Sequence, residues 1–149
     1  MFSPDQVLDL LDEIADGLDG DDGLADLGDH LLPRLAEAGQ ARDHRFTGYW
    51  RDVGTVSAYW ESHMDLLAPE PPIDLDEAGW PIQTQGGRYA AAWVAEGGRT
   101  DNVLLSAGSS IAGSVRDSVI SPDVRIEPGA TVRDSVLLHG VVVGAGAAS

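Results

Sequence analysis

The stretch Val115-Arg116-Asp117-Ser118-Val119 returns seventeen positions later as Val132-Arg133-Asp134-Ser135-Val136. The same offset aligns Gly129-Ala130 with Gly146-Ala147, Val124 with Val141, and Ile126 with Val143. Asp101-Asn102-Val103-Leu104 is a weaker copy that precedes the first by sixteen positions. Short β-branched runs that repeat at such a period, and that are broken by glycine, proline and aspartate, are typical of a parallel β-helix built from hexapeptide turns.

Three six-residue sides make one coil of such a β-helix, and one missing residue at a corner gives a period of seventeen. The inward valines and isoleucines stack from coil to coil, while Arg116, Asp117, Arg133 and Asp134 can remain outside. We therefore predict that residues 101–149 form the start of a left-handed parallel β-helix of roughly two and a half coils. This pattern is informative about architecture and says little about chemistry.

Ahead of the repeat, hydrophobic residues recur at helical spacing. Ser3-Pro4-Asp5-Gln6 is a strong helix start, with a serine cap, a proline at the first helical position and a capping box. Two apolar stripes follow: Val7, Leu11, Ile14 and Leu18, then Leu24, Leu27, Leu31 and Leu35 up to Gly39. Pro33 is expected to kink or end the second helix. We expect the first stripe to lie uncovered, because the sheet on which it would pack is missing.

A third helix is predicted after Thr55, which can serve as its N-cap. Val56, Trp60, Met64 and Leu67 recur there at helical spacing, and we expect Tyr59, Trp60 and Met64 to pack in a core. The segment Ala68-Pro69-Glu70-Pro71-Pro72 is rich in helix breakers and marks the best domain boundary. We predict a first domain over 1–68 and a linker over 69–100, in which the two Gly-Gly-Arg steps at 86–88 and 97–99 form turns.

The charge balance excludes several classes of partner. The net charge of the 149-residue chain is -16, which argues against binding to nucleic acid or to anionic membranes. All nine basic residues are arginines, so the chain offers no lysine ammonium group to any mechanism. It contains no cysteine, no secretory signal and no apolar run of about 18 residues, so the cytoplasm is the expected compartment.

The most chemically distinctive stretch is Gly48-Tyr49-Trp50-Arg51-Asp52-Val53-Gly54-Thr55. It combines flat aromatic faces, a guanidinium group and a hard carboxylate oxygen between glycines. Such a loop suits a hydroxylated, phosphorylated ligand held through a metal ion. The alternative interpretation is a buried aromatic corner that contains a satisfied Arg-Asp pair.

These residues also carry a family resemblance. The stretch 48–55, together with Ala58-Tyr59-Trp60-Glu61, Met64-Asp65-Leu66-Leu67 and Trp80-Pro81-Ile82-Gln83-Thr84, resembles bacterial glucose-1-phosphate adenylyltransferases (ADP-glucose pyrophosphorylases). The predicted hexapeptide coils resemble the C-terminal domain of that family. The resemblance implies an α+β chain, in which the helical C-terminal remnant of an α/β nucleotidyltransferase domain is followed by the β-helix.

The resemblance further implies an enzyme that forms ADP-glucose and pyrophosphate from ATP and glucose 1-phosphate for glycogen synthesis. By its match to the family motif, Asp52 is the expected catalytic residue that helps to hold Mg²⁺. Trp50 is expected to line the glucose pocket, with Tyr49 as a second substrate-binding residue. We expect Tyr49 and Arg51 to act mainly as structural supports.

The family's glycine-rich nucleotide loop, its other metal-binding aspartate and its catalytic lysines belong to an N-terminal half that this sequence lacks. We therefore expect a fragment that is inactive alone. One alternative is a non-catalytic β-helix module that binds partners or forms homo-oligomers through its coils. A related NDP-sugar pyrophosphorylase of other specificity is a closer rival, and a hexapeptide acyltransferase that uses His139 as its base is the weakest.

Overall fold

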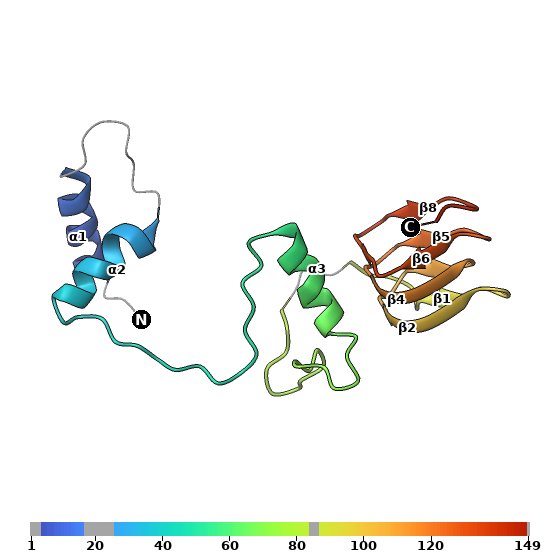
Figure 1. Ribbon diagram of the computed structural model, residues 1–149, viewed down its shortest axis with the longest axis horizontal. Coiled ribbons are helices and arrows are strands. Elements are labelled where there is room, and N and C mark those ends of the chain that lie inside the picture. Colours follow the sequence, from blue (N-terminus) through green and yellow to red (C-terminus); the bar gives the residue numbers. More distant parts are fainter. Residues whose placement is uncertain (1–3, 17–25, 84–86, 149) are drawn as a thin grey trace. The chain divides into compact units, whose positions relative to one another are not determined.

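The structure is a computed structural model that describes residues 4–16, 26–83 and 87–148, with the side chains of Gln6 and Leu27 excepted. The chain divides into two compact units, Met1–Thr47 and Gly48–Ser149. Figure 1 shows helices α1 and α2 in the first unit, and helix α3 with all the strands in the second. Across the described residues, the longest helices are too short and too polar to cross a lipid bilayer.

The first unit is a pair of helices, α1 (Pro4–Asp16) and α2 (Leu27–Glu37). Ile14 of α1 packs against Leu31 and Leu35 of α2, and all three side chains are buried. The prediction that the first stripe lies uncovered is therefore wrong for Ile14, because α2 supplies the apolar surface that a sheet was expected to provide. Leu18, Leu24 and the predicted Ser3 cap lie outside the described residues.

Helix α2 begins after an aspartate cap and is followed by a glycine at its C-terminal cap. The Asp26 side chain accepts a hydrogen bond from the Gly28 amide, and the helix runs through Pro33 as far as Glu37. Pro33 was predicted to kink or to end the helix, and it does not end it. Gly39 (φ +68°) follows the helix, and the amides of Gly39 and Gln40 donate to the carbonyls of Ala36 and Leu35. This is a Schellman C-cap, as the glycine stop signal predicts.

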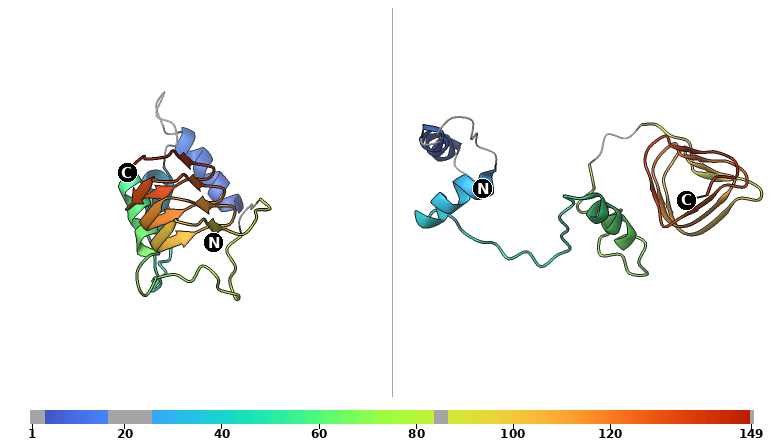
Figure 2. Two further views of the ribbon diagram at one scale, coloured as in Figure 1. Left: turned by 90° about the vertical axis from the view of Figure 1, so that its right-hand side faces the viewer. Right: turned by 45° about the horizontal axis from the view of Figure 1, so that its top comes forward.

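The second unit contains a parallel β-helix with two hydrogen-bonded sheets. Strands β1 (Trp93–Val94), β3 (Ser110–Ile111), β5 (Arg125–Ile126) and β8 (Val142–Val143) stack in that order in one sheet. The other sheet contains β2 (Arg99–Leu105), β4 (Ser114–Ile120), β6 (Thr131–Arg133) and β7 (Val136–Leu137), and the last two both pair with β4. The coils enclose a triangular cross-section when seen end-on (Figure 2, right). The predicted fold class is confirmed.

The strand register separates the coils by seventeen residues at some steps and by fifteen at others. Val115 pairs with Val132 and Val119 with Val136, as the repeat predicts. The weaker copy, however, pairs Val103 with Ser118 and Leu104 with Val119, an offset of fifteen, so the predicted offset of sixteen is wrong. The reason is a shortened corner: only Ala112-Gly113 connects β3 to β4, whereas 127–130 connects β5 to β6.

A left-handed backbone conformation marks another corner in each coil. Asn102, Asp117 and Asp134 all have positive φ, between 43° and 51°. The register places them one above another, and the Asn102 side-chain amide donates a 2.8 Å hydrogen bond to Asp117. Asparagine and aspartate tolerate this conformation better than other non-glycine residues, which explains why they occupy a sharp bend within β2, within β4 and between β6 and β7.

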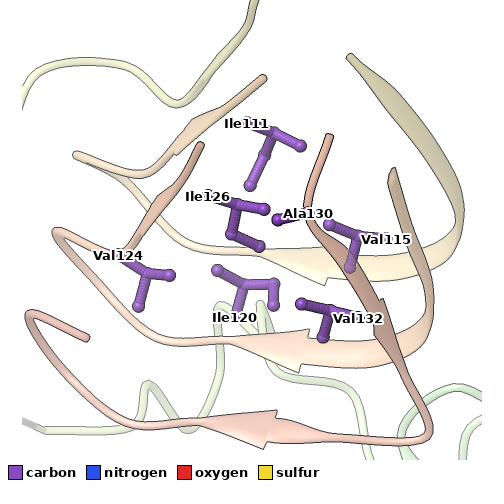
Figure 3. Packing of buried hydrophobic residues seen from close by; sticks show 7 residues of the cluster. All are labelled: Ile111, Val115, Ile120, Val124, Ile126, Ala130 and Val132. Atoms are coloured by element: carbon purple, nitrogen blue, oxygen red, sulfur yellow. The ribbon is translucent and has the colours of Figure 1, made fainter. Parts of the chain in front are cut away.

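The interior of the β-helix is apolar and closely packed (Figure 3). Its buried side chains come from all three sides of the coil: Ile111, Val115, Ile120, Val124, Ile126, Ala130 and Val132. Ser118 is also buried, and it donates to the Arg116 carbonyl and accepts from the Ser135 amide, so its hydroxyl is satisfied. Apart from Ser109 and Ser118, the buried side chains of the coils are hydrophobic, while Arg116 and Arg133 remain outside, as predicted.

Helix α3 (Val56–Asp65) contacts β4 on the outside of the coils. Thr55 caps it as predicted, because its hydroxyl accepts a 3.1 Å hydrogen bond from the Ala58 amide. The Trp60 indole donates a 2.7 Å hydrogen bond to the Asp134 carbonyl at the left-handed corner. No residue of α3 is buried, so the prediction that Tyr59, Trp60 and Met64 pack in a core is wrong among the described residues. The helix lies against an outer corner of the β-helix, and no further layer of the described residues covers it, so its apolar side chains stay partly exposed.

The first strands lie within the stretch 69–100 that was predicted as a linker. Strand β1 pairs with β3 from Trp93 onward, and β2 begins at Arg99. Between them, Gly97 adopts a positive φ in a turn, as predicted for the second Gly-Gly-Arg step. Because β1 begins at Trp93, the β-helix has about three coils and not two and a half, counted from the register of β1 with β3, β5 and β8.

Candidate functional site

The stretch 48–54 is bound to α3 through two carboxylates, of which Asp65 accepts most of the hydrogen bonds. Asp65, the last residue of α3, accepts three hydrogen bonds on its Oδ2 atom: from Tyr49 Oη at 2.8 Å, Arg51 Nε at 2.9 Å and Arg51 Nη2 at 2.8 Å. Arg51 Nη1 also donates to Glu61 Oε2 at 2.9 Å. We call the group formed by Tyr49, Arg51 and Asp65 the Asp65 clamp. It links positions that lie 16 and 14 residues apart in the chain.

The charges within the clamp support one another. Hydrogen bonds from Tyr49 and Arg51 hold the pKa of Asp65 below its ordinary value. The hydrogen bond to Asp65 raises the pKa of Arg51, and partial desolvation together with the same carboxylate raises the pKa of Tyr49. The clamp therefore holds an ionised carboxylate, a protonated guanidinium and a neutral phenol at neutral pH.

Trp50 and Asp52 alternate with the two clamped residues. Trp50 is 74% exposed, and Asp52 is exposed as well. Among the described residues, Asp52 makes no side-chain hydrogen bond or ion pair, and its carboxylate oxygens lie near Gly54. The two residues predicted to carry the chemistry thus present their side chains to solvent.

The alternative of a buried aromatic corner fails on this geometry. Tyr49 is itself 36% exposed, so neither aromatic residue is in a core. Arg51 does form a carboxylate pair, but its partners are Asp65 and Glu61 on α3, and not the neighbouring Asp52. Arg51 and Tyr49 both donate hydrogen bonds to Asp65, which is compatible with the supporting role expected of them, and the role of Tyr49 in binding substrate stays a prediction.

Sequence reasoning missed Asp65 and Glu61. These two carboxylates lie four positions apart on α3, so a helix places them on the same face, one turn from each other. Two carboxylates at that spacing, on the helix directly after a loop that contains Arg51, were the signal that could have identified the partners of this arginine. In the sequence analysis, Arg51 was paired with Asp52 of the same loop instead.

A groove lies between the start of α3 and the outer face of the coils. It has a volume of about 540 Å³ and an apolar lining. Its residues come from the end of the loop, the first turns of α3 and strand β7 with its following residue: Val53, Gly54, Thr55, Val56, Tyr59, Trp60, Val136 and Leu138. The groove begins directly after Asp52 in the chain.

The fit of these residues to Mg²⁺ is partial. No group of three or more histidine, aspartate or glutamate side chains able to hold a metal is found in 4–16, 26–83 and 87–148. Magnesium, however, commonly binds through one or two carboxylates and takes its other ligands from phosphates and water. Asp52 fits the role of a single carboxylate ligand, because its oxygens are exposed and not engaged by Arg51.

His139, the base of the weakest alternative, contacts a tyrosine. Its Nε2 atom lies 2.9 Å from Tyr89 Oη. Both side chains are exposed on the outside of the coils. This pair joins the segment before β1 to the corner after β7 and has no neighbouring acid or nucleophile at hydrogen-bonding distance among the described side chains.

Two family models match this chain, one before and one after residues 69–87. Residues 7–68 match the nucleotidyl transferase model, and residues 88–148 match the model of the GlmU-like C-terminal hexapeptide. The chain therefore combines a segment of a nucleotidyltransferase with a hexapeptide β-helix. This is the class of protein that the fold and the motif at 48–55 define together.

Individual relatives identify the family. The chain is 41% identical to a glucose-1-phosphate adenylyltransferase of Streptomyces avermitilis over 132 residues, which cover 80% of this chain and 32% of the relative. It is 38% identical to one of Corynebacterium jeikeium, covering 93% of this chain and 38% of the relative. A third, of Corynebacterium diphtheriae, is 37% identical and covers 99% of this chain and 37% of the relative.

The predicted resemblance is thereby confirmed: over most of its length this chain is a homologue of glucose-1-phosphate adenylyltransferases. It spans about a third of the length of the curated relatives it matches.

Proposed function

We propose that this chain supplies the sugar-phosphate side of a site that forms ADP-glucose and pyrophosphate from ATP and glucose 1-phosphate, for glycogen synthesis. The observation that supports the proposal best is that alternate residues of the stretch 49–52 differ in their contacts. Tyr49 and Arg51 are bound to α3, while Trp50 and Asp52 are exposed and unengaged among the described residues. In a ligand site, supporting residues are expected to fix the backbone, while the side chains that contact the ligand remain exposed.

Each exposed residue has a role that its chemistry allows. The Trp50 indole offers a flat apolar face on which one side of a pyranose ring can pack. The Asp52 carboxylate is the oxygen ligand that we assign to Mg²⁺, with phosphates and water completing the coordination. When bound, Mg²⁺ would screen the charge between the sugar phosphate and the α-phosphate of ATP. Tyr49 contributes to the sugar side through its position beside Trp50.

The isolated chain is expected to be inactive. One carboxylate and one aromatic face cannot bind a nucleoside triphosphate, align two phosphates and neutralise a departing pyrophosphate. Incubation of the purified chain with ATP, Mg²⁺ and glucose 1-phosphate should therefore give no ADP-glucose. Turnover above the level of a protein-free blank would contradict this expectation.

A chimera tests the assigned roles. We would replace the matching segment of the Streptomyces avermitilis relative with this chain and measure ADP-glucose formation. Asp52→Asn should lower kcat about 10²–10³-fold, in the range seen when one electrostatic contact to the transition state is removed. Trp50→Ala should mainly raise the KM for glucose 1-phosphate, by about tenfold for a loss of ~1.4 kcal/mol.

The control is Ser57→Ala, because Ser57 is exposed and lies in the same region of the chain without lining the groove. It should leave both constants nearly unchanged. Full activity of the Asp52→Asn chimera would refute the metal role. Preference of the chimera for another nucleoside triphosphate would favour the rival NDP-sugar pyrophosphorylase.

We further propose that the coils mediate homo-oligomer formation and that the protein acts in the cytoplasm. Strands β1 and β8 lie at the two ends of their sheet, and Trp93, Val94 and Val142 are exposed there. Exposed apolar edge strands favour pairing with another chain. Sedimentation over a range of concentrations should show association, and a monomer at every concentration would contradict it.

A further inference from the structure

We infer that Asp65 is a positioning residue, which orients Trp50 and Asp52 by holding Tyr49 and Arg51 against the end of α3. The inference deepens the proposed function and rests on it for the meaning of the oriented residues. The geometry itself is independent of any ligand. Asp65 touches neither Trp50 nor Asp52 through a hydrogen bond, so it acts through its two clamp partners.

The first step of the argument is the alternation of side chains along the loop. In an extended segment, successive side chains point to opposite sides. Tyr49 and Arg51 both reach the same oxygen of Asp65, so they share one side of the stretch. Trp50 and Asp52, the residues between and after them, are exposed and remain available to a ligand.

The second step is that little else holds the stretch. Among the described residues, the side-chain hydrogen bonds of 48–54 all end on Asp65 or Glu61. No backbone hydrogen bond outside the regular elements involves these residues in the same described part of the chain. The conformation of 48–54 therefore depends on the clamp. Gly48 and Gly54, at the two ends of this stretch, leave the backbone free to adopt other conformations.

The third step compares the two carboxylates on α3. Asp65 accepts three hydrogen bonds from two residues, and its side chain is 29% exposed. Glu61 accepts one bond from Arg51 Nη1, and its side chain is 50% exposed. A single exposed ion pair contributes little, whereas a carboxylate that joins an arginine fork and a phenol fixes geometry as well. Asp65 is therefore the residue on which the orientation depends.

The experiment measures backbone order parameters by amide NMR relaxation in the 149-residue chain. In Asp65→Asn, the amide order parameters of residues 49–53 should fall from about 0.85, typical of rigid backbone, to below about 0.6. Asparagine keeps the size of the side chain and removes its charge, so the hydrogen bonds that its oxygen still accepts from Tyr49 and Arg51 are weaker. Glu61→Gln is the matched control and should leave these values near those of the unmodified chain. Tyr49→Phe, which removes one of the three bonds, should give an intermediate result.

A readout on α3 separates positioning from general support. The indole signal of Trp60, bound to the Asp134 carbonyl, and the amides of α3 should be unchanged in Asp65→Asn. Loss of order throughout α3 would mean that Asp65 only stabilises the helix and would overturn the inference. Unchanged order parameters at 49–53 would overturn it as well. Asp65→Glu, which restores the carboxylate, should recover part of the order.

Failure of the proposed function has a different signature. Titration of the unmodified chain with glucose 1-phosphate and Mg²⁺ monitors Trp50 and Asp52 directly. If Asp65→Asn loosens 49–53 but neither residue responds to the sugar phosphate, the clamp stands and the proposed site fails. If both respond, Asp65→Asn should weaken the response at least severalfold.

Discussion

The β-helix and the α1–α2 pair bury their hydrophobic residues on very different scales. Seven buried residues from successive coils form one continuous interior in the β-helix. The helix pair buries three residues, Ile14, Leu31 and Leu35, between two elements that are near neighbours in the chain. The difference shows what a repeat achieves: each coil covers the apolar interior of the next, whereas a helix pair has one seam and then faces solvent.

The candidate site belongs to neither of these cores. Helix α3 has no buried residue and rests on the β-helix through the Trp60–Asp134 hydrogen bond and neighbouring contacts. Its loop is held by exposed and half-exposed polar groups. The site is thus attached to the region with the larger core without being part of that core, which is common for segments that bind ligands.

The largest effect should come from the β-helix interior. Ile120→Ala removes a side chain that is fully buried among neighbours from other coils, and should lower the free energy of unfolding by about 2–5 kcal/mol. Urea unfolding followed by far-UV circular dichroism would measure it. Arg133→Ala is the control, since the Arg133 side chain is exposed on the outside of the coils, and should change the free energy by less than about 0.5 kcal/mol. Equal effects of the two substitutions would mean that the coils are not packed as described.

A smaller effect should come from the shortened corner. A Cβ atom at Gly113 would lie 2.5 Å from the Ala130 carbonyl oxygen and 2.8 Å from that of Glu127. Because both obstacles are backbone atoms of the next coil, Gly113→Ala should cost about 1–3 kcal/mol. Gly144→Ala is the matched control, because nothing lies within 4 Å of its Cβ position. If the two variants unfold at the same urea concentration, the close approach of the coils at this corner is refuted.

The left-handed bend at Asn102 and Asp117 shows which part of the fold could be predicted from the sequence. Val115–Val119 and Val132–Val136 have the same letters, so their register of seventeen was found directly. The first coil was misaligned by one residue, because Asp101 was matched to Asp117 by identity. The structure aligns Asn102 with Asp117 instead, since both need the left-handed conformation at the bend. A backbone requirement shared by asparagine and aspartate is invisible to letter matching.

The candidate site was predicted in part for a similar reason. Trp50 and Asp52 were singled out from the motif, and both are exposed and unengaged in the described part of the chain. The role of Asp65 was not found, because it depends on a contact between residues 14 and 16 positions apart. The core predicted for α3 failed because helical spacing says which residues share a face, and not whether an apolar surface exists opposite that face.

The smallest effect should come from the helix pair. Ile14→Val removes one methylene from its seam and should cost about 0.5–1.5 kcal/mol. The two units divide near Thr47, so this cost should be confined to α1 and α2. Amide hydrogen exchange should accelerate up to about tenfold in Pro4–Asp16 and Leu27–Glu37, since 1.4 kcal/mol corresponds to a factor of ten, while strand β4 keeps its protection. Leu8→Ala, at a 59% exposed position of the same helix, is the control and should leave exchange nearly unchanged. Faster exchange in β4 would show that the helix pair and the coils unfold together, and the contrast between an extended repeat interior and a single local seam would then lose its thermodynamic basis.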